Sequence, residues 1–390
     1  MLTLNETQLM LQETAEKIAA KYGPEYWREH DEQEQYPQDF IDELGAQGFF
    51  GLAVPEAEGG SGQGMTELCL AMEALCRGGG GGGPALGYLF GLLGTLTLVN
   101  SATDEQRRDY LQPFAQGDKV CAFALSEPDA GTNSFNMQTR AVPEGDGFRI
   151  SGSKWWITNL QHSDALLLVA RTDATGGGGK SPASLSLFMV DLPNPNLSFQ
   201  PIPKHGFNYY KSNQLFIDDL YLPRRALVGE LGKGFKSLAP TLNAERLLVA
   251  AGAIGLARLA LGRAIDYARE RVVFDVPIGS HQGVQHPLAS AHARVESAWL
   301  TVRQAAALED TGSEPSQASS LANIAKYIAV EAAIDACYHA VQVHGGAGYA
   351  REYHLERWWR EVQLFRLAPL TQQMTLNFIG QHVLGLPKSY

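Results

Sequence analysis

The chain has 390 residues, of which 45% are apolar and 19% are charged, and its formal net charge is −11 at pH 7. This composition is typical of a folded globular protein, and the length exceeds what one hydrophobic core usually serves, so we expect two or three packed units. The acidic balance argues against a nucleic-acid backbone or an anionic membrane surface as the main partner.

The N-terminal segment lacks a basic stretch followed by an apolar core, so it does not have the pattern of a secretory signal. Its amphipathic pattern predicts a helix that opens with a capping box from Thr3 to Glu6. Because 18 apolar residues never run uninterrupted, we expect no membrane span. The four cysteines form neither a CxxC pair nor a Cys/His cluster. We therefore expect no metal site, and free thiols in a cytoplasmic protein.

Residues 1–118 have a helical pattern. Apolar residues recur at spacings of three and four in "TELCLAMEAL" (66–75), and Thr103 with Gln106 forms a capping signal. The glycine run at 78–84 follows a helical segment rather than a strand, so it does not have the context of a dinucleotide-binding turn. We expect a mobile loop there, because glycine restricts the backbone least.

Residues 119–231 have the pattern of an antiparallel β-barrel or sandwich. The segments are short, apolar or alternating, and bounded by Gly, Pro, Asn and Asp. Asp146 and Gly147 predict a hairpin turn, and "RTDATGGGGKSP" (171–182) a flexible hairpin loop. The predicted strands lie within 120–127, 165–173, 184–192, 197–203 and 214–223.

Helical patterns return from 232 to 390. A helix that begins near Leu242 is expected to exceed 30 residues, and helical texture continues over 295–308. Further helices are predicted over 319–344 and 353–385.

Glu245 and Arg246 stand at the head of an apolar run that extends to Ala257. Residues three and four apart share a helix face, but neither charge has a charged partner at those spacings. Charged side chains are rarely buried without a partner. Glu245 is therefore either a solvated residue in a first helical turn, favoured by the helix dipole, or a functional carboxylate.

Three short motifs each allow a structural and a functional interpretation. In "ALSEPDAGTN" (124–133), hydroxyl groups and backbone N–H groups form either a ligand-binding turn or an ordinary one. In "KWWITN" (154–159), two tryptophans at a strand end are either core residues or ligand contacts. In "VQVHGGAGY" (341–349), glycines either cap a helix or allow close approach of a ligand.

Taken in order and spacing, these motifs resemble the acyl-CoA dehydrogenase family of flavoproteins across nearly the whole chain. "FFGLAVPEAEGGSG" (49–62) and "RVVFDVPIGSHQ" (271–282) are similar to two further segments of that family. The resemblance implies an α+β fold with an N-terminal helical domain (1–118), a middle antiparallel β-barrel or sandwich domain (119–231) and a C-terminal four-helix bundle (232–390). It also implies FAD, a homotetramer and an electron-transferring flavoprotein as the acceptor.

Position by position, the resemblance assigns FAD binding to Phe123, Leu125, Ser126, Gly131, Thr132, Trp156, Ile157, Thr158, Arg271, Phe274, Gln282, Gln342, Gly345, Gly346, Thr371 and Gln373. It implies that 123–132 lie along the flavin and its phosphates, and that 156–158 flank the isoalloxazine, with Thr158 near N5. The groups at 271–282 and 342–346 would reach the FAD of a neighbouring subunit. The last two residues would contact the adenosine half.

The chain departs from the family pattern at three positions. Asn133 stands where an aspartate is usual, and Asp275 where a glycine is usual, which puts the local turn in doubt. Pro369 stands where many members carry the glutamate that removes the substrate proton. In isovaleryl- and long-chain-type members the base comes from the long helix instead, and that position is Glu245.

The implied reaction removes an α-proton and a β-hydride from an acyl thioester and leaves a trans double bond, with flavin N5 as the hydride acceptor. A carboxylate whose pKa is raised by an apolar pocket suits the proton transfer. The resemblance places Asn243 and Arg246 near the substrate. Alternatives are an acyl or aminoacyl group on a carrier protein, a flavin oxidase or monooxygenase, and a scaffold without flavin.

Overall fold

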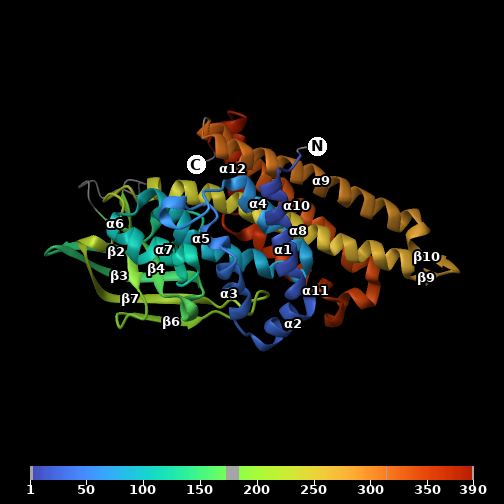
Figure 1. Ribbon diagram of the computed structural model, residues 1–390, viewed down its shortest axis with the longest axis horizontal. Coiled ribbons are helices and arrows are strands. Elements are labelled where there is room, and N and C mark those ends of the chain that lie inside the picture. The colour runs from blue at the N-terminus through green and yellow to red at the C-terminus, as the bar shows by residue number, and fades with distance from the viewer. Residues whose placement is uncertain (1–2, 173–183, 313, 389–390) are drawn as a thin grey trace.

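In a computed structural model of the protein, the described residues are 3–172, 184–312 and 314–388. N-terminal helices come first, a β-sheet unit follows, and long helices complete the chain (Figure 1). The predicted helix–sheet–helix order and the α+β class are therefore confirmed. Most of the predicted loop at 171–182 lies outside the described residues.

The N-terminal helices begin with a cap that differs from the expected one. Asn5 caps the first helix and accepts a hydrogen bond from the backbone N–H of Gln8, so the predicted box from Thr3 to Glu6 is shifted. The capping box from Thr103 to Gln106 is confirmed. The helices are α1 Glu6–Lys21, α2 Pro24–Gln33, α3 Gln38–Ala46, α4 Met65–Leu75, α5 Gly83–Ser101, α6 Asp104–Gln106 and α7 Gln112–Gln116.

The prediction of a mobile loop at 78–84 is wrong. A π-helical turn follows α4, and α5 begins at Gly83, with the glycines packed against large aromatic side chains. A Cβ atom on Gly83 would lie 2.3 Å from the ring of Trp27, and one on Gly81 would lie 2.5 Å from that of Trp358. Here the missing side chains create space for close packing rather than for motion.

The middle of the chain folds into one eight-stranded sheet in the order β6-β7-β3-β2-β4-β5-β8, with β1 beside β4. The pairings are antiparallel except for β1 with β4 and a short contact of β2 with β4. The strands are β1 Cys121–Ala124, β2 Arg140–Glu144, β3 Gly147–Thr158, β4 Ala165–Arg171, β5 Leu185–Asp191, β6 Leu197–Pro201, β7 Ser212–Pro223 and β8 Leu227–Val228.

The hairpin between β2 and β3 turns one residue earlier than predicted. Glu144 pairs with Gly147, so the two turn residues are Gly145 and Asp146. Gly145 adopts a φ of 59°, which glycine tolerates best. Gly147 belongs to the sheet, where a Cβ atom would lie 2.2 Å from the carbonyl oxygen of Leu222.

The C-terminal part is built around α8, which is 37 residues long and confirms the predicted long helix. The helix predicted over 353–385 is interrupted after Leu367, because Pro369 cannot donate the backbone hydrogen bond that would continue it. The elements are α8 Gly234–Glu270, β9 Val272–Val273, β10 Val276–Pro277, α9 Gln282–Thr311, α10 Pro315–His344, α11 Leu355–Leu367 and α12 Gln372–Phe378.

Helices α5 and α8 are long and apolar enough, by length and composition, to cross a membrane. However, 72% of the most apolar stretch of each is buried within the fold, which accounts for their hydropathy. Both helices belong to the largest hydrophobic core, which joins the N-terminal and C-terminal helices.

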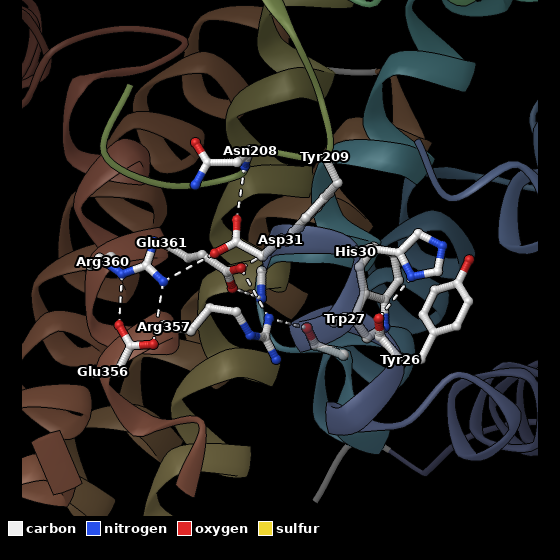
Figure 2. Close-up of polar contacts among 12 residues, drawn as sticks. Tyr26, Trp27, His30, Asp31, Asn208, Tyr209, Glu356, Arg357, Arg360 and Glu361 are labelled. Atoms are coloured by element: carbon white, nitrogen blue, oxygen red, sulfur yellow. Dashed lines mark hydrogen bonds and ion pairs between the residues drawn. The ribbon is translucent and has the colours of Figure 1, made fainter. Parts of the chain in front are cut away.

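A buried ionic network fastens α11 to the N-terminal helices (Figure 2). Glu361 accepts hydrogen bonds from the Arg357 guanidinium at 3.0 Å, the Tyr209 hydroxyl at 2.7 Å and the backbone N–H of Gly82 at 3.0 Å. Arg357 is 1% exposed and Glu361 is fully buried. Arg357 lies one turn earlier on α11, whereas Tyr209 and Gly82 come from other parts of the chain, so the network locks α11, the β6–β7 connection and the residue before α5 together.

Candidate active site

The turn after β1 is held by a buried ion pair. Glu127 and Ala130 exchange two backbone hydrogen bonds, which closes the turn between them. The ammonium of Lys154 on β3 contacts the Glu127 carboxylate at 3.0 Å and donates to the Leu125 carbonyl at 3.0 Å. Because the pair is buried, it fixes the position of Ser126, the first hydroxyl of the predicted flavin-binding segment.

Glu127 also holds the chain on the far side of the turn. Its carboxylate accepts the backbone N–H groups of Gln138 and Thr139. Burial opposes ionisation of Glu127, but the charge of Lys154 and these hydrogen bonds prevail and lower its pKa. The sequence alone does not predict this pair, because Glu127 lies in the turn after β1 and Lys154 on β3, and no local spacing links them.

Trp156 is presented to the outside by an irregularity in β3. The pairing with β7 shifts between Lys154 and Ile157, and Trp156 in this bulge has a φ of 65°. A positive φ is strained for a large side chain and usually persists only where the surroundings impose it. The indole is 53% exposed, so Trp156 is not half of a core aromatic pair.

The next two residues of β3 face different surroundings. The Ile157 side chain is buried in the core of the sheet, and its carbonyl accepts the Asn213 amide at 2.9 Å. Thr158 ends the strand opposite Ser212, and their hydroxyl oxygens are 3.4 Å apart. Thr158 is only partly buried, so its hydroxyl is available at the strand end.

Two predicted glycines have open space where a side chain would stand. An added Cβ atom on Gly131 or Gly346 would meet no atom within 4 Å, and neither has a left-handed φ. Neither packing nor backbone geometry within the chain therefore requires glycine there. The turn that contains Gly131 lies against β3 next to the exposed Trp156 indole, and open space there suits a large planar cofactor with a pyrophosphate, so these residues fit FAD.

Phe123 and Leu125 border this turn on the inside. Phe123 packs, partly buried, against both the helical core and the core between the sheet and the helices. Leu125 contacts the second of these cores together with Leu242 of α8. Ser126 and Thr132 remain at least partly exposed. The end of β1 thus lies against the N-terminal half of α8.

The predicted residues of the α8–α9 hairpin lie elsewhere. Arg271, Phe274 and Gln282 are exposed, and the hairpin projects from the end of the molecule opposite the sheet (Figure 1). One chain therefore does not bring them together with Ser126. The turn that Asp275 put in doubt does form, with Phe274 and Asp275 at φ values of 53° and 63°, as a tight two-residue hairpin requires.

The remaining predicted cofactor residues occupy two helix ends. Gln342 is in the last turn of α10, and Gly345 and Gly346 follow it, exposed. Thr371 caps α12, because its hydroxyl accepts the backbone N–H of Met374 at 3.3 Å. Gln373 is exposed in the first turn of α12.

Glu245 lies inside α8, not in its first turn. The helix begins at Gly234 and includes Pro240, so a helix-dipole role at the N-terminus does not apply. The side chain is 9% exposed, and no hydrogen bond or ion pair reaches its carboxylate within the described part of the chain. Burial raises the pKa of Glu245 to about 7, against the opposing charge of Arg246.

The direction of the Glu245 side chain follows from its helix face. Thr241 is four residues earlier and so shares that face. The Thr241 hydroxyl is 3.0 Å from the hydroxyl of Thr97 on α5, in a buried contact. Glu245 is therefore directed toward the α5 side of α8, where Phe90 and Gly91 remain partly exposed on an otherwise buried stretch.

Arg246 is held by Asn243, the other residue predicted to lie near the substrate. Its guanidinium donates to the Asn243 side-chain oxygen one turn earlier, while its Nε is buried and lacks a hydrogen-bond partner among the described residues. Burial lowers the pKa of Arg246, and Glu245 opposes that shift. The two charges that open the apolar run are thus neighbours without a direct ion pair between them.

Comparison with known families places each part of the chain. Residues 5–118 match the acyl-CoA dehydrogenase N-terminal domain, 122–220 the acyl-CoA dehydrogenase middle domain, and 232–384 the acyl-CoA dehydrogenase C-terminal domain. Together these matches cover most of the chain.

Individual relatives agree with these matches. Acyl-CoA dehydrogenase fadE12 of Mycobacterium tuberculosis (strain CDC 1551 / Oshkosh) is 38% identical over 386 residues, which are 99% of this chain and 98% of that protein. The caffeyl-CoA reductase-Etf complex subunit CarC of Acetobacterium woodii is 34% identical over 372 residues, 95% and 96% of the two chains. The structure of butyryl-CoA dehydrogenase from Megasphaera elsdenii superposes with a TM-score of 0.92 at 29% identity, over 98% and 100%.

Proposed function

Because the chain belongs to the acyl-CoA dehydrogenase family, we propose that it oxidises an acyl-CoA thioester to the trans-2-enoyl-CoA, with FAD as cofactor and Glu245 as the general base. The observation that carries this proposal is the Glu245 carboxylate, which is buried, unpaired within the described chain and raised in pKa to about 7. A base whose pKa lies near neutral pH combines availability of the ionised form with a strong tendency to take a proton.

The chain's own residues would perform three tasks. Glu245 takes the proton from the α-carbon, and its apolar surroundings exclude water that would compete for it. Asn243 and Arg246 border the substrate on the same helix; Asn243 holds the Arg246 guanidinium, which keeps positive charge beside the carboxylate. Pro369 has no ionisable group, so it leaves the proton transfer to α8.

Bound FAD would supply the hydride acceptor. The turn after β1, with Ser126, Gly131 and Thr132, and the exposed indole of Trp156 would hold it against Thr158. Arginine suits a pyrophosphate, because its planar donors make paired, charge-assisted hydrogen bonds. The α8–α9 hairpin, which carries Arg271, projects from the end of the molecule opposite the sheet, and this supports an assembly in which Arg271 serves a neighbouring subunit.

The electron acceptor and the assembly of subunits are proposed from the same family membership. CarC is named as a subunit of a reductase-Etf complex, which supports an electron-transferring flavoprotein as the partner of this chain. The exposed hairpin residues support at least a dimer and, by analogy with the family, a homotetramer. We place the enzyme in the cytoplasm.

Anaerobic mixing with acyl-CoAs tests the proposal. The purified protein is expected to be yellow and to lose its flavin absorbance when straight, branched and cyclic acyl-CoAs are added in turn. The acyl group that bleaches the flavin fastest identifies the substrate class. A colourless protein that takes up no added FAD would contradict the proposal.

A further inference from the structure

Lys326 on α10 is a fully buried cation that the reaction described above does not use. Its ammonium donates to the carbonyl of Leu370 at 2.8 Å and to the side-chain oxygen of Gln372 at 3.2 Å. Within the described residues it forms no ion pair with a carboxylate. Burying an ammonium against neutral acceptors is costly, so the contact is expected to serve a purpose beyond packing.

The two acceptors lie at the start of α12. Leu370 precedes the helix cap, and Gln372 is the first residue of the helix. Gln372 is 3% exposed, and its amide also donates to Glu331 at 2.8 Å. Lys326 and Glu331 therefore hold Gln372 from two points of α10.

The neighbours of Gln372 face the other way. Thr371 is partly exposed and Gln373 is exposed, although the residue between them is buried. These two positions are the ones that the family resemblance assigns to the adenosine half of FAD. Holding Leu370 and Gln372 inward thus turns the cofactor-facing residues outward.

We propose that Lys326 is a positioning residue for the cofactor: its ammonium orients the first turn of α12 so that Thr371 and Gln373 face bound FAD. The inference rests on the proposed FAD site. Because Lys326 is fully buried, it would itself touch neither FAD nor substrate. Its effect passes through the Leu370 carbonyl and the Gln372 side chain.

Two substitutions with a matched control test the proposal. Lys326→Met keeps the length and removes the charge and the donors, whereas Lys326→Arg keeps both. Arg366→Met removes a cation from the same network, where Arg366 pairs with Glu331 at 2.7 Å but not with Leu370. FAD affinity is measured by flavin fluorescence titration, and hydrogen exchange of residues 368–378 is measured on the flavin-free protein.

Lys326→Met is expected to weaken FAD binding about tenfold, the scale of losing one charge-assisted hydrogen bond, and to speed exchange in α12 to a similar degree. Lys326→Arg is expected to keep most of the FAD affinity and most of the exchange protection of α12. Arg366→Met is expected to change the FAD affinity and the exchange rate by less than about twofold. A Lys326→Met protein with wild-type FAD affinity would overturn the proposal. So would weaker binding without faster exchange in α12.

A milder variant covers the case in which Lys326→Met does not fold. Gln372→Leu removes one of the two acceptors and is expected to weaken FAD binding about threefold; unchanged binding would again overturn the proposal. Failure of the wild-type protein to bind FAD would contradict the proposed function instead. The exchange measurement on flavin-free protein keeps the two outcomes distinct.

Discussion

Glu361 on α11 and Glu245 on α8 are both buried glutamates, yet their surroundings are opposite. Glu361 is enclosed by the Arg357 guanidinium, the Tyr209 hydroxyl and the Gly82 N–H (Figure 2). Glu245 has no hydrogen-bond partner in the described chain. A carboxylate that is fully partnered fastens segments together, whereas one that is buried and unpartnered remains free to react. Burial alone therefore does not separate a structural acid from a chemical one.

The sharpest way to test this contrast is to neutralise Glu245. Glu245→Gln keeps the shape and removes the base, so flavin reduction by acyl-CoA is expected to slow by roughly two to four orders of magnitude, with FAD still bound. Stopped-flow absorbance measures the rate. Glu270→Gln, at the exposed end of the same helix, is the matched control and should react at the wild-type rate. Undiminished bleaching in Glu245→Gln would remove the assignment of the base.

The complementary substitution removes the partnered acid. Glu361→Ala leaves Arg357 buried without its counter-charge, which is expected to lower the free energy of unfolding by about 3–5 kcal/mol. Glu356→Gln breaks the partly exposed pair with Arg360 and should cost less than about 1 kcal/mol. Chemical unfolding measures both. Equal stability of the two variants would mean that the Glu361 network does not fasten α11.

The raised pKa of Glu245 also predicts how pH acts on stability. The folded-state pKa of Glu245 is about 7 and its ordinary value is 4.5, so the folded protein retains a proton that the unfolded chain has already released. Stability attributable to this group is therefore present below pH 4.5 and falls as pH rises through 7.

Melting curves of the wild type and Glu245→Gln across this range check that sign. The variant lacks the titrating group. Its free energy of unfolding, relative to that of the wild type, should therefore increase as pH rises, by up to about 3 kcal/mol at pH 8, and most of this difference should disappear near pH 5. A pH-independent difference would show that Glu245 is not buried in solution as it is here.

A smaller effect is expected from two glycines with opposite surroundings. Gly83→Ala forces a methyl group against Trp27 and should destabilise the fold by about 1–3 kcal/mol. Gly346→Ala meets open space, so stability should change by less than about 0.5 kcal/mol, while FAD affinity falls severalfold. Thermal melts and FAD titration separate the two. Normal FAD binding by Gly346→Ala would exclude this glycine from the cofactor site.

The sequence predicts the fold well because the relevant signals are local. Strand alternation and helical spacing depend on neighbouring residues, and the long α8 and the order of elements follow from them. The absence of charged partners at three and four residues singles out Glu245 locally, whereas its role as the base is implied only by the family resemblance. Pairs such as Glu127 with Lys154 were not identified, because tertiary packing brings them together.

The glycine run at 78–84 is a second case in which tertiary contacts, not local sequence, decide the structure. Its composition is that of a flexible segment, and only the positions of Trp27, Trp358 and Glu361 reveal why it is rigidly packed. Likewise, the family resemblance assigns Ser126 and the residues of the α8–α9 hairpin to the same kind of cofactor site. Within one chain, however, the hairpin lies at the end of the molecule opposite the sheet (Figure 1).

The bulge that turns Trp156 outward also equips the protein with an optical probe. Its indole is half exposed at the edge of the predicted cofactor site, whereas Trp27 and Trp358 are fully enclosed. Their emission should therefore be blue-shifted, and that of Trp156 and of the 40% exposed Trp359 red-shifted. Occupancy of the site by a yellow chromophore should then quench the Trp156 share of the long-wavelength component first, so that the drop in this component follows the filling of the site without any added label.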